Sequence, residues 1–122
     1  MIISRNISNN SLTIVFTEKD KVNAILTYVR QNVLDNEKIK ISAIADEFNM
    51  SPNYVSVFIK KHAGISIQNY VIQTKMKMAE RLLKQTSLNF SEIAMKMGFT
   101  DSSHFTKAFK KNRGMTPKAF RK

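Results

Sequence analysis

Two stretches of this chain carry polar and basic side chains at the spacing of a helix face. If Val55 and Phe105 face inward, about 100° of rotation per residue places hydroxyl, amide and ammonium groups on the opposite side. Such groups can bond to base edges and phosphates, and neither outward face contains an acid that would repel phosphate. The outward positions are Asn53, Ser56, Val57 and Lys60 in the first stretch and Ser103, Thr106, Lys107 and Lys110 in the second. A solvated face without any ligand is the simpler alternative.

The sequence offers few groups for catalysis or for metal binding. It contains no cysteine, which excludes thiolate nucleophiles, thiolate metal ligands and disulfides. Its two histidines, His62 and His104, lie in different stretches and have no carboxylates at a matching spacing. We therefore expect no enzyme, no metal site and no cofactor.

The net positive charge arises in one part of the chain. The net charge is +11, from 20 Lys and Arg and 9 Asp and Glu in 122 residues. Residues 1–50 hold six bases and six acids, whereas residues 51–122 hold fourteen bases and three acids. This asymmetry indicates a polyanionic partner, either nucleic acid or an anionic membrane surface.

The length and composition fit one domain or two small lobes. Apolar residues make up 43% of the chain, more than in a sequence that is disordered by composition. No apolar run approaches the roughly 18 residues of a membrane-spanning helix. Met1-Ile2-Ile3 is followed at once by polar residues, unlike a signal peptide. We expect a cytoplasmic protein.

The apolar pattern from residue 17 onward is helical. A strand is expected over 12–16, and Thr17-x-x-Asp20 then resembles a capping box. Apolar residues recur at i, i+3, i+4 and i+7, which is typical of amphipathic helices. The sequence therefore predicts an all-α fold, with helices over about 18–34, 41–48, 52–63, 66–85, 90–97, 101–113 and 117–121.

The helical part contains one unit written twice. Ile44-Ala45 matches Ile93-Ala94 at an offset of 49, and Lys60-Lys61 and Gly64 match Lys110-Lys111 and Gly114 at an offset of 50. Chance could reproduce the apolar spacing but hardly the paired lysines and the glycines as well. Each unit is a short helix, a turn and a longer helix, which is the helix-turn-helix arrangement. The helix over 66–85 is about 30 Å long, close to the roughly 34 Å of one duplex turn.

The second unit and the helix before it carry a family signature. Met76-x-x-Ala79-x-x-Leu82-Leu83 leads into Ile93-Ala94-x-x-x-Gly98-Phe99-x-Asp101-x-Ser103-x-Phe105-x-x-x-Phe109-Lys110, and Gly114-x-Thr116-Pro117-x-x-Phe120-Arg121 closes the run. This signature resembles the DNA-binding domain of AraC/XylS-type bacterial transcription regulators. With the less regular first unit, the resemblance extends over nearly all of 20–122.

The resemblance implies seven helices, with two helix-turn-helix subdomains joined by a long linker helix. We expect an N-terminal extension or linker remnant over 1–18, a first subdomain over 19–65, the linker helix over 66–85 and a second subdomain over 86–122. The implied function is sequence-specific binding of double-stranded DNA in the bacterial nucleoid, with one reading helix from each unit in successive major grooves. Members commonly activate transcription by contacting RNA polymerase.

The resemblance also carries roles over to particular side chains. The candidates for reading bases are Asn53, Ser56, Val57, Ser102, Ser103, Thr106 and Lys107. The candidates for phosphate contact are Ser51, Tyr54, Lys60, Lys61, His104, Lys110 and Lys111. Two residues depart from the family pattern: Val57 stands where many relatives carry a long polar side chain, and Phe120 replaces the commoner tyrosine.

Several other side chains receive a less specific interpretation. We expect His62 to lie at the partly covered edge of the core. We expect four methionines to fill space in the core or at its edge, namely Met76, Met78, Met95 and Met97. We expect four basic residues to add general attraction for an anion, namely Arg113, Lys118, Arg121 and Lys122.

Other functions and states of assembly stay open at this point. A protein-interaction module would need an exposed apolar patch. A membrane-surface protein would need a basic helix with a free apolar face, and the closest match is 66–85 with Lys75, Lys77, Arg81 and Lys84. The chain is either a stand-alone regulator, expected to bind DNA as a monomer, or a fragment of a longer one that dimerises through a further domain.

Overall fold

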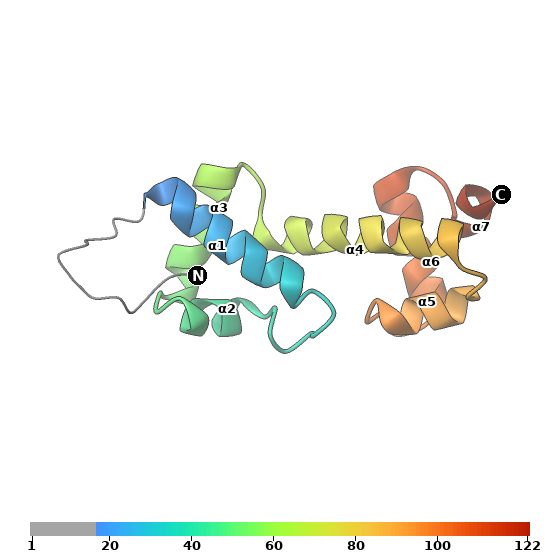
Figure 1. Cartoon of the computed structure of the whole chain (residues 1–122), viewed down its shortest axis with the longest axis horizontal. Coiled ribbons are helices and arrows are strands. Elements are labelled where there is room, and N and C mark those ends of the chain that lie inside the picture. Colours follow the sequence, from blue (N-terminus) through green and yellow to red (C-terminus); the bar gives the residue numbers. More distant parts are fainter. Residues whose placement is uncertain (1–16) are drawn as a thin grey trace.

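The computed structural model describes residues 17–122, which form seven α-helices (Figure 1). The helices are α1 (Glu18–Gln31), α2 (Ile41–Glu47), α3 (Pro52–Ala63), α4 (Ile67–Gln85), α5 (Phe90–Lys96), α6 (Ser102–Arg113) and α7 (Pro117–Arg121). The predicted all-α fold is confirmed for this part of the chain. The predicted strand over 12–16 lies outside the described residues.

Side-chain caps determine where most of the helices begin. Thr17 forms a capping box with Asp20 at the start of α1, and Asn89 forms one with Glu92 at the start of α5. Such a box satisfies backbone N–H groups that have no partner within the helix. The other side-chain caps are Ser51 of α3, Ser66 of α4, Asp101 of α6 and Thr116 of α7.

The first helix ends three residues earlier than the sequence predicts. Asn32 leaves the helical conformation with φ −116° and ψ 15°, and its side-chain amide donates to the carbonyl oxygen of Tyr28 at 2.8 Å. This local bond competes with continuation of the helix. Asp35 then accepts hydrogen bonds from the backbone N–H groups of Glu37 and Lys38, which forms the polar turn before α2.

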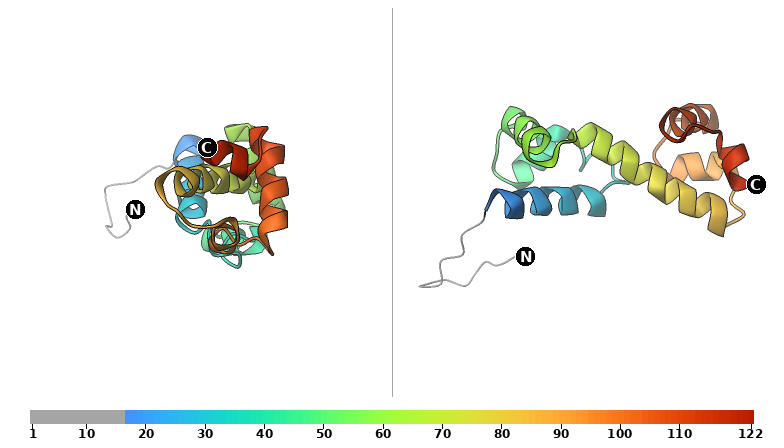
Figure 2. Two further views of the ribbon diagram at one scale, coloured as in Figure 1. Left: turned by 90° about the vertical axis from the view of Figure 1, so that its right-hand side faces the viewer. Right: turned by 90° about the horizontal axis from the view of Figure 1, so that it is seen from above.

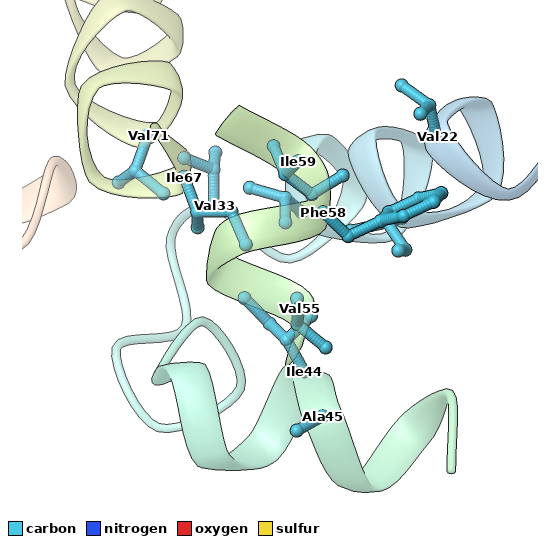
Figure 3. Packing of buried hydrophobic residues seen from close by; sticks show 11 residues of the cluster. Val22, Val33, Ile44, Ala45, Val55, Phe58, Ile59, Ile67 and Val71 are labelled. Carbon is cyan, nitrogen blue, oxygen red and sulfur yellow. The ribbon is translucent and has the colours of Figure 1, made fainter. Parts of the chain in front are cut away.

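Two separate hydrophobic cores lie at the two ends of α4. The first core joins α1, α2 and α3 to the N-terminal part of α4; Figure 3 shows Val55, Phe58 and Ile59 of α3 projecting into it. The second core joins the C-terminal part of α4 to α5 and α6, with Phe105 and Phe109 fully buried. Burial of each large apolar side chain contributes roughly 1.5–3 kcal/mol. The long helix therefore bridges two packed groups of helices (Figure 1).

The turns inside the two repeated units differ in length by one residue and in the residue type at the left-handed position. The turn before α3 has Asn49 at φ 54°, and the turn before α6 has Gly98 at φ 81°. This left-handed region suits glycine and, next to it, asparagine. Both units then end on a left-handed glycine, Gly64 or Gly114. The repeat that the sequence predicts is thus a repeat of backbone conformation.

Candidate nucleic-acid interface

The second helix of each unit, α3 or α6, lies on the same side of the molecule. In the right-hand view of Figure 2 both are seen nearly end-on along one edge, with α1 along the opposite edge. Their inward faces pack into the two cores, as the sequence predicts: Val55, Phe58 and Ile59 are buried in α3, and Phe105 and Phe109 in α6. Their polar faces are therefore directed outward together.

The outward face of α3 presents the predicted side chains. Asn53 and Lys60 are exposed, Ser56 is half-buried, and the apolar side chain of Val57 is 58% exposed. An exposed valine on a helix face offers methyl groups, which can contact the methyl group of thymine. Tyr54 is 48% exposed and stacks on Phe58 with 5.6 Å between the ring centres, so its position is fixed by packing.

Two further phosphate candidates flank α3. Ser51 uses its hydroxyl oxygen to accept a hydrogen bond from the backbone N–H of Tyr54 at 3.1 Å, and its own proton remains able to donate. Lys61 is exposed near the C-terminal end of the helix. His62 is also exposed, but its ring lies 4.6 Å from that of the buried Phe58, as expected of a residue at the partly covered edge of the core. The aromatic contact occupies one side of the imidazole and leaves the other in solvent.

The outward face of α6 presents more positive charge than that of α3. Ser103, Lys107, Lys110 and Lys111 are exposed, whereas Ser102 and Thr106 are half-buried. His104 is exposed, and its ring meets Phe99 edge-on at 5.1 Å between the ring centres. The cap of Asp101 accepts from the backbone N–H of His104, which fixes the first turn of the helix.

The lysines of both outward faces keep their charge available. Within residues 17–122 there are two ion pairs, Lys40 with Glu37 and Arg113 with Glu80. Neither pair uses a lysine of α3 or α6. Unneutralised ammonium groups on one side of a protein attract a polyanion and release its counterions on binding.

Arg113 binds within the protein and corrects the expectation that it serves general attraction. Its Nε donates to Glu80 at 2.8 Å and its Nη1 donates to the side-chain carbonyl of Gln73 at 2.7 Å. Gln73 also donates to the side chain of Asn112 at 3.2 Å. These bonds join the C-terminal end of α6 to the middle of α4 and so help to fix the crossing of the two helices.

Arg121 requires the same correction. Its guanidinium donates to the carbonyl oxygens of Leu83 at 2.9 Å and Leu88 at 2.6 Å, which lie at and beyond the end of α4. Carbonyls at a helix C-terminus have no partner within the helix, and a guanidinium satisfies several of them at once. The sequence contained a signal for this role, because Arg121 is part of the family signature rather than of an irregular basic tail.

Lys75 is the residue for which the sequence was most misleading. Its side chain is only 7% exposed, and its Nζ lies 5.6 Å from the centre of the Phe99 ring. Burial lowers the pKa of this ammonium group from its ordinary value. The sequence placed Lys75 among the exposed cations of the linker helix, whereas in the fold Phe99, from the turn between α5 and α6, lies against it.

Met95 also differs from its prediction. It is 79% exposed on α5, whereas Met76 and Met97 are buried as expected.

In residues 17–122 no group of three or more His, Cys, Asp or Glu side chains is placed to hold a metal ion. Among the same residues no helix has the length and the apolar character needed to cross a membrane.

Comparison with known proteins extends these observations. A family model described as a helix-turn-helix domain matches residues 44–122. The Msm operon regulatory protein of Streptococcus mutans is 37% identical over 84 residues, covering 69% of this chain and 30% of that protein. The transcriptional activator RhaS of Pectobacterium atrosepticum is 30% identical over 105 residues, covering 86% of this chain and 37% of that protein. The chain thus spans less than half the length of these two relatives.

A solved structure supports the same likeness over most of its length. The C-terminal domain of AraT, a response regulator from Geobacillus stearothermophilus, is 31% identical and superimposes with a TM-score of 0.76. The likeness covers 82% of this chain and 82% of that one. It therefore includes both repeated units and the helix between them.

Proposed function

The chain belongs to the AraC/XylS family of helix-turn-helix transcription regulators, and we propose that it binds double-stranded DNA of specific sequence through α3 and α6. In this proposal each helix enters one of two successive major grooves. Asn53, Ser56 and Val57 read bases in one groove. Ser102, Ser103, Thr106 and Lys107 read bases in the other. The flanking candidates for phosphate contact are Ser51, Tyr54, Lys60, Lys61, His104, Lys110 and Lys111.

The observation that carries this proposal is the shared orientation of the two reading helices. Both expose a face without acids on the same side of the molecule, and α4 separates them (Figure 2). The 19 residues of α4 span about 28 Å, and successive major grooves on one face of a duplex lie about 34 Å apart. Two cores, one at each end of α4, support a division into subdomains over 19–65 and 86–122 with a linker helix over 66–85.

The proposal includes activation of transcription through contact with RNA polymerase in the bacterial cytoplasm. One relative is named a transcriptional activator, and this name supports activation rather than repression.

A membrane-surface function has less support, because Lys75 of α4 is buried and the apolar stripe of that helix is occupied by the two cores. Sedimentation with uncharged liposomes should leave the protein in solution, and any electrostatic adsorption to anionic liposomes should be lost when salt is added.

Selection of bound sequences from a random duplex library tests the proposal. We expect an enriched site with two conserved blocks about one helical turn apart. Titration on that site should then show a slope of log K against log salt near −5 to −7, corresponding to about six to eight neutralised phosphates. Binding without sequence preference, or affinity that does not change with salt, would refute sequence-specific DNA binding.

A further inference from the structure

A cleft between α4 and α6 lies beside the outward face of the second reading helix. Its volume is about 560 Å³. Gln68 and Asn69 line it from the first turn of α4, and His104, Lys107, Lys111 and Asn112 line it from α6. In the right-hand view of Figure 2 the first turns of α4 lie between α3 and α6, on the side that both helices share. The cleft, lined by the first turn of α4 and by α6, therefore lies in the region between the two reading helices.

The electrostatic character of the cleft is positive. His104, Lys107 and Lys111 are spaced three and four residues apart, which places them on one side of α6. Both lysines are exposed, and neither is paired with a carboxylate within residues 17–122. No acidic residue is among those that line the cleft. The space accordingly favours an anion.

Hydrogen bonds orient a neutral donor on the opposite wall. The side-chain oxygen of Asn69 accepts from Gln73 Nε2 at 3.5 Å, and the same nitrogen donates to Asn112 at 3.2 Å. Arg113 donates to the side-chain oxygen of Gln73 at 2.7 Å and thereby fixes the direction of that amide. Because the oxygen of Asn69 is engaged with Gln73, its Nδ2 group is the part left to donate to a ligand.

We propose that this cleft binds a phosphodiester of the DNA segment between the two major-groove sites, with Asn69 as donor on one side and Lys111 on the other. This inference rests on the proposed function, since it needs both reading helices on one duplex. A protein that occupies two successive major grooves faces the backbone between them, and α4 is the element that faces it. The linker helix is then a third point of contact with DNA.

The substitution Asn69→Asp isolates this contact. It keeps the oxygen that accepts from Gln73, replaces the donor Nδ2 by a second oxygen and adds one negative charge. Asn69 is the third residue of α4, after the cap Ser66, and a carboxylate there interacts favourably with the helix dipole. Thermal unfolding should therefore be unchanged or shifted upward, while affinity for the selected duplex should fall about tenfold through a lost hydrogen bond and added repulsion.

The matched control is Asn23→Asp, which makes the same chemical change on α1. Asn23 is exposed, and α1 lies along the edge of the molecule opposite the reading helices (Figure 2). Its affinity should stay within about twofold of the wild type, because charges separated by more than about 10 Å are largely screened at 0.1 M salt. Equal affinity losses in the two variants would overturn the cleft contact.

Duplexes with a single neutral methylphosphonate supply a second measurement. The probe is the selected site, with one phosphate at a time replaced across the segment between the conserved blocks. At one position we expect the wild type to lose about tenfold in affinity and Asn69→Asp to lose much less, because its contact is already missing. Lys111→Gln should show the same reduced sensitivity.

The outcomes separate this inference from the function on which it rests. If the wild type binds the selected duplex but no neutral substitution between the blocks affects it, the cleft contact is overturned and sequence-specific binding stands. If the wild type selects no duplex at all, both fail together. Asn69→Asp with wild-type affinity would likewise overturn the contact.

Discussion

At the scale of single residues, the lysines of this protein fall into two kinds with opposite consequences. Lys60, Lys107 and Lys110 are exposed on the outward faces of α3 and α6, where an ammonium group is stable in water and available to phosphate. Lys75 is buried against Phe99, where its charge is costly. The first kind should determine DNA affinity, and the second should affect the free energy of unfolding.

Substitutions on the reading helices should separate base contacts from phosphate contacts. Asn53→Ala and Lys107→Ala should each cost about 1–3 kcal/mol of binding free energy on the selected site and relax specificity. Lys110→Ala should weaken binding to all duplexes similarly and reduce the salt slope by about 1. Competition titrations with cognate and scrambled duplexes measure both effects. If all three variants lose the same affinity on every sequence, this division of roles is wrong.

Replacing Lys75 should change stability in a pH-dependent way. Lys75→Met keeps an unbranched side chain up to Cε and removes Nζ. It gives up a cation–π contact worth about 0.5–1 kcal/mol and removes the larger cost of burying a charge, so urea midpoints at pH 7 should rise. The folded-state pKa of Lys75 is lowered below its unfolded value. Between those two values the unfolded state binds more protons, so this lysine makes wild-type stability rise with pH on the alkaline side of neutrality.

The comparison between the two proteins isolates that contribution. The advantage of Lys75→Met over the wild type should shrink as pH rises toward the ordinary lysine pKa of about 10.4. Tyr28 has a pKa raised by burial and then by Glu47 and Asp35, an effect of opposite sign on stability that is common to both proteins. An advantage that stays constant from pH 7 to pH 10 would contradict a buried ammonium group.

At the scale of elements, the two repeated units have the same plan but different helix starts. The short helix of the second unit, α5, begins with the Asn89–Glu92 capping box. Its counterpart α2 begins at Ile41, and the N-cap residue Lys40 makes no side-chain cap although its backbone is extended at φ −63° and ψ 144°. The backbone at Lys40 already has the conformation of an N-cap, so a residue with a capping side chain at this position should stabilise α2.

Two substitutions at N-cap positions should change the free energy of unfolding in opposite directions. Asn89→Ala should lower the free energy of unfolding by about 1 kcal/mol, and Lys40→Asn should raise it by about 0.5–1 kcal/mol. Lys40→Asn also removes the ion pair with Glu37, whose side chains are 59% and 79% exposed, so little is lost with it. Thermal and urea unfolding measure both changes. Ser87→Ala, at an exposed loop position, should change stability by less than about 0.5 kcal/mol.

At the scale of the whole molecule, α4 determines the distance and the angle between the reading helices. It contributes Ile67 and Val71 to the first core and Met76, Ala79 and Leu83 to the second, so neither end can move without exposing apolar surface. The bonds of Arg113 to Gln73 and Glu80 add a polar attachment on the side of α6. We therefore expect the two reading helices to behave as one rigid unit rather than as two tethered ones.

A rigid connection makes a prediction about the spacing of the DNA site. Inserting five base pairs between the two conserved blocks turns the second block by about half a helical turn, and inserting ten restores its face but adds about 34 Å. Both insertions should reduce affinity to that of a duplex with one block, measured by fluorescence anisotropy. A flexible tether would instead recover affinity at ten base pairs, which would refute the role of α4 as a fixed spacer.

The sequence by itself determined the helices, the repeat and the inward faces of the reading helices. Those features depend on neighbours along the chain: Thr17 lies three residues from Asp20, and Phe105 lies one helical turn from Phe109. Side-chain types and periodicity are sufficient for such local interactions. The same reasoning identified the outward residues of α3 and α6, whose roles on DNA stay predictions.

Only the tertiary structure decided which long polar side chains point into the protein. Arg113 meets Glu80 and Gln73 across a helix crossing, and Lys75 is covered by a turn that lies more than twenty residues away in the sequence. The partners of a long charged side chain depend on the angle at which two helices pack, and this angle leaves no period in the sequence of either helix. For the same physical reason the sequence does not predict the cleft between α4 and α6, which exists only because the two helices pack side by side.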